Sequence, residues 1–330
     1  TKKIMDMDID KNNKDKPTCL RWGKNHPILA IGTERGLIYY YNKKNEKFYP
    51  VTMNHTKAVI SADWNDEGSL ATGDENKSLS VTNRNGEPIL QNATLKADPK
   101  MIKWARQKTS DNKGSFTTIS TVLLNKTILI YDIKKKTNPI ELALDSDYGN
   151  IVTYQWFGDG YIAIGFTKGY VSIISTHMTE IKNEVNSIQP FRSGLDDLSV
   201  CEEVNRLAVA GENCVKFFDT NTWVEIAEEK IEISVQSGRI AKIQWSSTGQ
   251  ILIVSTLMGS IFAFNVVVND AFAVCKNLFT SLCSLNEIVT YEVTQSNVQK
   301  LYQIQLIEEP RVFAVSQKYL VASFGTRYQV

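Results

Sequence analysis

Histidine and cysteine are the residue types in this 330-residue chain that are best suited to acid–base, nucleophilic or metal chemistry. The three histidines, His26, His55 and His177, lie far apart in the sequence. The five cysteines form no C-x-x-C pair, and they are Cys19, Cys201, Cys214, Cys275 and Cys283. This spacing offers neither a metal-ligand cluster nor a disulfide framework, and it is typical of free thiols in a reducing compartment.

The sequence also lacks the signatures of common enzyme sites. It contains no G-x-x-x-x-G-K-[ST] phosphate loop, no G-x-G-x-x-G fingerprint, no G-x-S-x-G nucleophile elbow and no H-E-x-x-H zinc motif. Gly36, Gly169 and Gly259 follow tight turns, and we interpret them as structural glycines rather than as a phosphate cradle. We therefore predict that the chain is not an enzyme and that it has no cofactor and no metal site.

Charge is balanced in this chain. Its 37 Lys and Arg residues and 36 Asp and Glu residues give a formal net charge of +1. Since a dedicated nucleic-acid binder normally carries a basic excess, we expect no nucleic-acid partner. The basic runs Lys43-Lys44 and Lys134-Lys135-Lys136 are interpreted as solvated hairpin tips, with an anionic lipid or an acidic partner as the alternative. No apolar run is long enough to span a bilayer, so we expect no transmembrane segment.

The elements that carry these residues repeat along the chain. Residues 149–176 contain three short apolar runs separated by Gly-bearing turns, which predicts a β-meander. The first run ends at Trp156, and the same local frame recurs at Trp22, Trp64, Trp104 and Trp245. A period of roughly 40–45 residues with four short strands is typical of a β-propeller blade.

We therefore predict an all-β fold, a WD40-type β-propeller expected to have seven blades of four-stranded antiparallel sheet, as one domain over residues 1–330. The six clear units lie near 18–50, 57–92, 100–142, 150–180, 196–230 and 239–268. Residues 276–330 are compatible with an incomplete seventh unit or with the start of a second propeller. Two polar insertions, 106–116 and 181–195, are predicted to be surface loops.

The loops around the central channel of a propeller are where function is expected. The turns between the second and third strands should all lie at one end of the channel. They would form a rim of mixed charge that suits protein or peptide recognition, and a merely solvated rim is the alternative. The candidate partner-binding rim residues are Glu34, Arg35, Glu75, Asn76, Lys126, Lys168 and Glu212.

Several short segments resemble the WD-repeat family. Tyr131-Asp132 and Phe218-Asp219 occupy the place of the family's Trp-Asp dipeptide, and Asn54-His55 occupies the place of its Gly-His dipeptide. That resemblance implies that the His55 imidazole is linked to a nearby Ser/Thr and Asp inside one blade. Such a role is structural, because a buried polar network must be satisfied internally. His26 and His177 are interpreted as loop residues.

A more specific resemblance is carried by longer segments, which are 55–65 (HTKAVISADWN), 69–89, 147–177, 211–219 and 279–293. In order, and over nearly the whole chain, they resemble the intraflagellar transport protein 144 family, also called the WD-repeat protein 19 family. The resemblance implies that the chain is a portion of the N-terminal propeller region of much longer proteins. It also implies a non-catalytic scaffold or adaptor subunit of intraflagellar transport complex A. Such a subunit acts in retrograde ciliary transport and in the import of membrane-protein cargo into cilia.

The same resemblance implies the partners and the location. The partners would be other complex A subunits, a tubby-like adaptor and ciliary membrane cargo, at the cilium and ciliary base (basal body), on the cytoplasmic side. Two other functions were weighed: a coat-type propeller that recognises short cargo peptides in vesicle traffic, and an enzyme on a propeller scaffold. The first needs convergent charges on the rim, whereas this rim is mixed in sign. The second needs a base, nucleophile or metal constellation that the sequence does not offer.

Overall fold

The chain is described by a computed structural model that covers residues 15–51, 55–105, 117–134, 139–144, 146–177, 180, 183–246, 248–265, 272–284, 286–295, 297–308, 310–324 and 326–330. Within these ranges the regular structure consists of antiparallel β-strands and three short 3₁₀ turns, η1 (Ser146–Tyr148), η2 (Ala227–Glu229) and η3 (Val235–Ser237). No helix in this part of the chain is long and apolar enough to cross a membrane. The predicted all-β class is confirmed.

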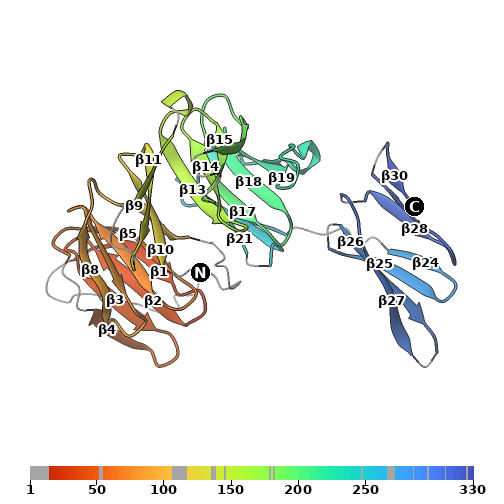
Figure 1. The fold of residues 1–330 in the computed structure, drawn as a ribbon, viewed down its shortest axis with the longest axis horizontal. Coiled ribbons are helices and arrows are strands. Elements are labelled where there is room, and N and C mark those ends of the chain that lie inside the picture. The colour runs from red at the N-terminus through yellow and green to blue at the C-terminus, as the bar shows by residue number, and fades with distance from the viewer. Residues whose placement is uncertain are drawn as a thin grey trace. The chain divides into compact units, whose positions relative to one another are not determined.

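The chain folds into two compact units, and Figure 1 shows the strands of both. The first unit comprises Thr1–Leu198, Val209–Lys216 and Ile231–Ile233. The second unit comprises Ser199–Ala208, Phe217–Lys230 and Ser234–Val330. In every sheet, strands that are consecutive in the sequence are also hydrogen-bonded neighbours. This is the meander pattern that the repeat predicts.

The first unit contains four complete four-stranded sheets. The first sheet consists of β1 (Pro17–Trp22), β2 (Ile28–Thr33), β3 (Ile38–Asn42) and β4 (Lys47–Val51). The second consists of β5 (Val59–Trp64), β6 (Leu70–Asp74), β7 (Ser78–Thr82) and β8 (Pro88–Thr94). The third consists of β9 (Lys100–Trp104), β10 (Thr118–Leu123), β11 (Thr127–Asp132) and β12 (Ile140–Ala143). The fourth consists of β13 (Ile151–Phe157), β14 (Tyr161–Phe166), β15 (Val171–Ser175) and β16 (Glu184–Ile188).

The fifth sheet contains residues of both units and consists of β17 (Asp197–Cys201), β18 (Arg206–Gly211), β19 (Cys214–Asp219) and β20 (Ile231–Glu232). Three further sheets belong to the second unit. The sixth consists of β21 (Ile240–Trp245), β22 (Ile251–Thr256) and β23 (Ile261–Asn265). The seventh consists of β24 (Phe272–Cys275), β25 (Leu278–Ser284), β26 (Glu287–Val293) and β27 (Val298–Gln305). The eighth consists of β28 (Val312–Val315), β29 (Leu320–Ser323) and β30 (Tyr328–Gln329).

Two features differ from the sequence prediction. β16 pairs with β15 inside the stretch 181–195 that was predicted to be a loop, because an exposed outer strand does not need apolar alternation. The described residues also contain eight sheets where seven blades were expected. β27 already fills the fourth place of its sheet, so β28 begins another sheet within 276–330. The predicted loop at 106–116 lies outside the described residues.

The central strands of the first unit are buried on both faces, whereas β1 and the outer strands β8 and β16 are largely exposed. The central strands β6, β10 and β15 have no exposed residue, which explains their nearly continuous apolar runs. Three clusters of apolar side chains form the core between neighbouring sheets, and each includes one tryptophan: Trp64, Trp104 or Trp156. Packing against the next sheet therefore supplies the partner surface that one meander lacks alone.

The recurring tryptophans link each sheet to the one before it. In the first unit, the indole N–H donates to an oxygen of the preceding sheet: Trp64 to Arg21 O at 3.0 Å, Trp104 to Asp63 O at 2.9 Å and Trp156 to Ser120 Oγ at 2.7 Å. In the second unit, Trp245 donates to Ser199 O at 3.2 Å. The repeat in the sequence thus reflects a repeated need to fill an interface and to satisfy one buried donor.

Two glycines allow the close approach of neighbouring sheets. Gly36 has φ +86°, and a Cβ atom there would lie 2.6 Å from His55 O. Gly169 has φ +81°, and its Cβ would lie 2.1 Å from Phe191 O. A side chain at either position would collide with the backbone that leads into the next sheet. The structural interpretation of these glycines is confirmed.

Candidate interaction surface

All seven predicted rim residues are exposed, belong to the first unit and lie in turns between the second and third strands of a sheet. Glu34 and Arg35 connect β2 with β3, Glu75 and Asn76 connect β6 with β7, Lys126 connects β10 with β11, Lys168 connects β14 with β15, and Glu212 connects β18 with β19. Every sheet runs through its strands in the same order, so these turns occupy equivalent places in five consecutive sheets.

Backbone contacts join these turns to the chain that enters the next sheet. Ile151 N donates to Asn125 O at 2.7 Å, and Phe191 N donates to Gly169 O at 3.4 Å. Among the described residues, however, no hydrogen bond or ion pair joins any two of the seven rim side chains.

The rim carries no excess of either charge. Its acidic residues are Glu34, Glu75 and Glu212, and its basic residues are Arg35, Lys126 and Lys168. Equal numbers of both signs produce no single-sign field that would attract a polyanion from a distance. Such a row suits a partner surface that also alternates in charge.

Two of the rim side chains are already engaged within the protein. Glu212 Oε1 accepts hydrogen bonds from Ser193 N and Ser193 Oγ, both at 2.8 Å, and from Arg192 N at 3.0 Å. The bonds from Ser193 in particular lower the pKa of Glu212, because they favour the charged carboxylate. Asn76 Nδ2 donates to Thr56 Oγ1 at 3.0 Å. These two residues order neighbouring loops, and the remaining charged rim side chains are the ones open to a partner.

His55 forms a buried polar network inside the second sheet. Its ring is 0% exposed, with Nδ1 at 3.0 Å from Asp74 Oδ2 and Nε2 at 2.9 Å from Thr72 Oγ1. Asp74 Oδ1 accepts the backbone N–H groups of Asn76 and Ser78, both at 2.9 Å. Burial lowers the pKa of His55 although the Asp74 carboxylate opposes this shift, so the ring is neutral at pH 7. The link to Thr and Asp that the resemblance implied is confirmed.

The other histidines lie in loops, as predicted. His26 lies between β1 and β2 and packs edge-on against Trp64, with ring centroids 4.5 Å apart. His177 follows β15, and its Nδ1 lies 2.9 Å from Ser175 Oγ. In the part of the chain that the structure describes, no group of three or more His, Cys, Asp or Glu residues could hold a metal ion.

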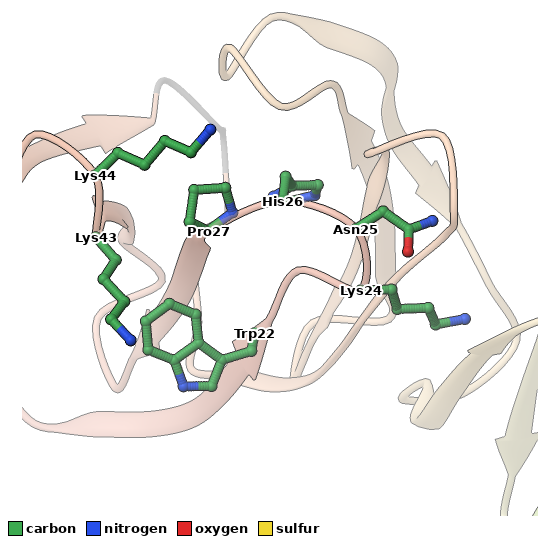
Figure 2. A pocket seen from close by; sticks show the side chains of 7 residues that line it. All are labelled: Trp22, Lys24, Asn25, His26, Pro27, Lys43 and Lys44. Carbon is green, nitrogen blue, oxygen red and sulfur yellow. The ribbon is translucent and has the colours of Figure 1, made fainter. Parts of the chain in front are cut away.

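One site was missed by sequence reasoning. A pocket of about 450 Å³ beside the first sheet is lined by Trp22, Lys24, Asn25, His26, Pro27, Lys43 and Lys44, as Figure 2 shows. Lys43-Lys44 was interpreted as a solvated hairpin tip, with an anionic lipid or an acidic partner as the alternative, and Trp22 as an anchor of the repeat. The sequence could have indicated this pocket, because the β1–β2 and β3–β4 turns of a meander lie at the same end of the sheet.

Comparison with known proteins decides the family. A family model described as "WDR19 first beta-propeller" matches residues 1–259. The chain belongs to this family. It is 30% identical to the mouse protein "WD repeat-containing protein 19" over 97% of its own length. It is 27% identical to "WD repeat-containing protein dyf-2" of Caenorhabditis elegans over 92% of its length. The chain spans only 24% and 22% of the lengths of these relatives.

Solved structures with low sequence identity show the same fold. The β-propeller domain of Cps50 (Swd1) from Myceliophteria thermophila aligns with a TM-score of 0.58 and 13% identity, over 95% of this chain and 94% of that one. The computationally designed Ika8 protein aligns with a TM-score of 0.56 and 15% identity, over 94% of both chains. Together with the family match, these alignments confirm the predicted WD40-type β-propeller fold.

Proposed function

We propose that this chain is a non-catalytic propeller of an intraflagellar transport complex A subunit and that it serves as a platform for protein–protein interaction. The observation that carries the proposal is the family match over residues 1–259. The proposed partners are other complex A subunits, a tubby-like adaptor and ciliary membrane cargo. The proposed setting is retrograde transport and cargo import at the cilium and its base, on the cytoplasmic side.

The use of the polar side chains supports a scaffold rather than an enzyme. His55 is of a residue type suited to acid–base chemistry, yet its side chain is 0% exposed and is held by Asp74 and Thr72 inside the second sheet. The rim, by contrast, presents Glu34, Arg35 and other charged side chains to solvent. A row of exposed charges along successive turns can meet a partner over the roughly 800 Å² per side that stable complexes use.

The proposal is tested with the full-length protein that contains this chain, tagged and expressed in ciliated cells. Affinity purification followed by mass spectrometry should recover complex A subunits. Recovery of coatomer subunits alone would contradict the proposal and favour a coat-type propeller that recognises short cargo peptides.

A rim variant then tests whether this surface takes part. Reversing two open charges with Glu75→Lys and Lys168→Glu should reduce the recovery of at least one subunit several-fold, since like charges would then oppose a complementary partner. Lys134→Glu is the matched control, because Lys134 is exposed at the opposite end of the third sheet. Equal recovery with the rim variant and with the control would show that the rim is only solvated.

A further inference from the structure

The rim turn between β10 and β11 contains a leucine whose backbone conformation is unusual for this residue type. Leu124 has φ +53° and Asn125 has φ +58°, so both central residues of the turn are in the left-handed region. The turn is closed by Lys126 N, which donates to Leu123 O at 3.1 Å. Turns of this kind favour Asn and Gly, and bulky residues are uncommon there. The backbone of the turn therefore gives no reason for a leucine.

Burial gives no reason for this leucine either, because Leu124 is 76% exposed. The equivalent turn of the fifth sheet has the same backbone signs, with φ +50° at Glu212 and +58° at Asn213. There the Glu212 carboxylate holds the chain that enters the fifth sheet, through Arg192 N and Ser193 N. A leucine side chain forms no such hydrogen bonds. Its exposed apolar surface would gain from burial against a partner, since that removes it from water.

Two lysines lie at the same turn as Leu124. Lys100 begins β9, and its Nζ donates to Asn125 Oδ1 at 3.4 Å, while Lys126 directly follows Asn125. Both lysines are exposed, and neither forms an ion pair within the part of the chain that the structure describes. Two uncompensated positive charges therefore border the exposed leucine.

A third lysine lies in the neighbouring rim turn. The chain that enters the fourth sheet contacts both turns, because Ile151 N donates to Asn125 O at 2.7 Å and Lys168 N donates to Tyr148 O at 3.3 Å. Tyr148 is half-buried and stacks on Tyr170, with ring centroids 4.7 Å apart. Lys168 is exposed and has no ion-pair partner among the described residues. The third and fourth sheets thus present three lysines, a leucine and a tyrosine pair on one stretch of the rim.

We propose that this surface, which we name the Leu124 patch and which consists of Lys100, Leu124, Lys126 and Lys168, binds a short acidic peptide. An apolar side chain of the peptide would pack on Leu124, and carboxylates on either side of it would pair with the lysines. The proposal rests on the proposed role of the chain as an interaction platform, and it names the partner chemistry for one part of the rim.

The surroundings of the Leu124 patch favour a short peptide over an anionic membrane. Stable attachment to a bilayer takes more apolar surface than one leucine side chain supplies. A flat bilayer would also meet exposed acidic residues nearby, with Asp147 in the segment that enters the fourth sheet and Glu75 in the rim turn of the second sheet. A peptide a few residues long can place its carboxylates at the lysines and avoid these neighbours.

The experiment measures fluorescence anisotropy of the labelled peptide Gly-Glu-Glu-Phe-Glu-Glu-Gly with the purified 330-residue chain. Saturable binding is expected, with no binding of the same peptide carrying Lys in place of Glu. The double variant Lys100→Glu/Lys126→Glu should bind at least about tenfold more weakly, because attractive pairs become repulsive. Circular dichroism confirms that the variant is folded.

Leu124→Asn separates a binding role from a structural one. Asn suits the left-handed conformation of the turn, so the melting temperature should stay the same or rise. The affinity for the peptide should nevertheless fall several-fold, because the apolar contact is lost. A lower melting temperature with unchanged affinity would show that Leu124 serves the fold and would overturn the proposal.

The matched charge control is Lys134→Glu, which alters an exposed lysine at the opposite end of the third sheet and should leave the affinity unchanged. The proposal is overturned if the acidic peptide shows no saturable binding, or if this control weakens binding as much as the double variant does. Binding to phosphatidylserine-containing vesicles without peptide binding would also overturn it and would assign the patch to a membrane surface. Recovery of complex A subunits by the full-length protein, together with no peptide binding, would reject the Leu124 patch and leave the proposed function in place.

Discussion

Replacing His55 with alanine removes the centre of the polar network in the second sheet. The imidazole is 0% exposed and makes contacts of 3.0 Å to Asp74 Oδ2 and 2.9 Å to Thr72 Oγ1. Truncation leaves one carboxylate oxygen and one hydroxyl without this partner beside a new cavity. We expect the first unit to lose about 3–5 kcal/mol of unfolding free energy.

The size of this loss in unfolding free energy follows from the hydrogen bonds that remain after the imidazole is removed. Asp74 is 1% exposed, and its Oδ1 keeps the backbone N–H groups of Asn76 and Ser78, so only Oδ2 loses its bond. A buried acceptor that is charged and unpaired costs about 1–3 kcal/mol or more. The lost Thr72 bond adds about 1 kcal/mol, and the cavity adds a further contribution. For a unit of this size, such a loss lowers the melting temperature by at least about 6 °C.

The assay is urea unfolding at pH 7.5, monitored by tryptophan fluorescence, with thermal unfolding by circular dichroism as a second measurement. His177→Ala is the matched control, because His177 is only half-buried and its ring makes one hydrogen bond, at 2.9 Å to Ser175 Oγ, and one edge-on contact with Tyr161. It should cost less than about 1 kcal/mol. A double-mutant cycle with Thr72→Val should give a coupling of about 1 kcal/mol. The reasoning is refuted if His55→Ala destabilises the chain no more than His177→Ala does.

Three further predictions concern pH, the tryptophans and the glycines. Burial lowers the pKa of His55 in the folded state, so the unfolded state binds its proton more readily, and stability should be full above about pH 6.5 and fall below it. Urea titrations at several pH values should show a smaller loss between pH 7.5 and 5.5 for His55→Gln than for the wild type, and equal slopes would contradict this. Trp64→Phe and Trp156→Phe each remove one indole donor, to Arg21 O and Ser120 Oγ, and should each cost about 1 kcal/mol. Because the acceptors lie in different sheets, the double variant should be additive, and a coupling above about 0.5 kcal/mol would be evidence against independent links. Gly169→Ala places a Cβ 2.1 Å from Phe191 O and should cost several times as much as Gly158→Ala in the same sheet, whose Cβ meets only Tyr161 at 3.6 Å. Similar unfolding free energies for these two variants would show that the backbone yields easily.

The repeated architecture could be predicted from the sequence because it depends on short-range patterns. An apolar run that ends in Trp and is followed by a polar turn specifies a strand end and its hairpin, wherever it occurs. Gly36 and Gly169 could be predicted as structural because a tight turn with positive φ favours glycine. The partners of His55 came from the WD-repeat resemblance, since Asp74 and Thr72 are 19 and 17 residues away and no local pattern connects them.

Other features depend on burial and three-dimensional neighbours that the local pattern does not contain. The strand β16 is mostly exposed, so hydrogen bonding to β15 creates it without an apolar signal. Residues 276–330 divide between two sheets because β27 pairs with β26 and completes one sheet, so that β28 begins another. The pocket lined by Trp22, Lys24 and Lys43 requires two turns that are separated in the sequence to be brought together.

Residues of the same type have different roles in this propeller according to what covers them. Trp22 and Trp64 share one frame of the repeat, yet Trp64 is 1% exposed and links two sheets, whereas Trp22 is 52% exposed. Glu75 and Glu212 both lie in rim turns, yet Glu212 is held by Ser193 while Glu75 makes no side-chain bond within the described residues. The repeat therefore fixes where a residue lies in its sheet, whereas the contacts of that residue in three dimensions decide its role.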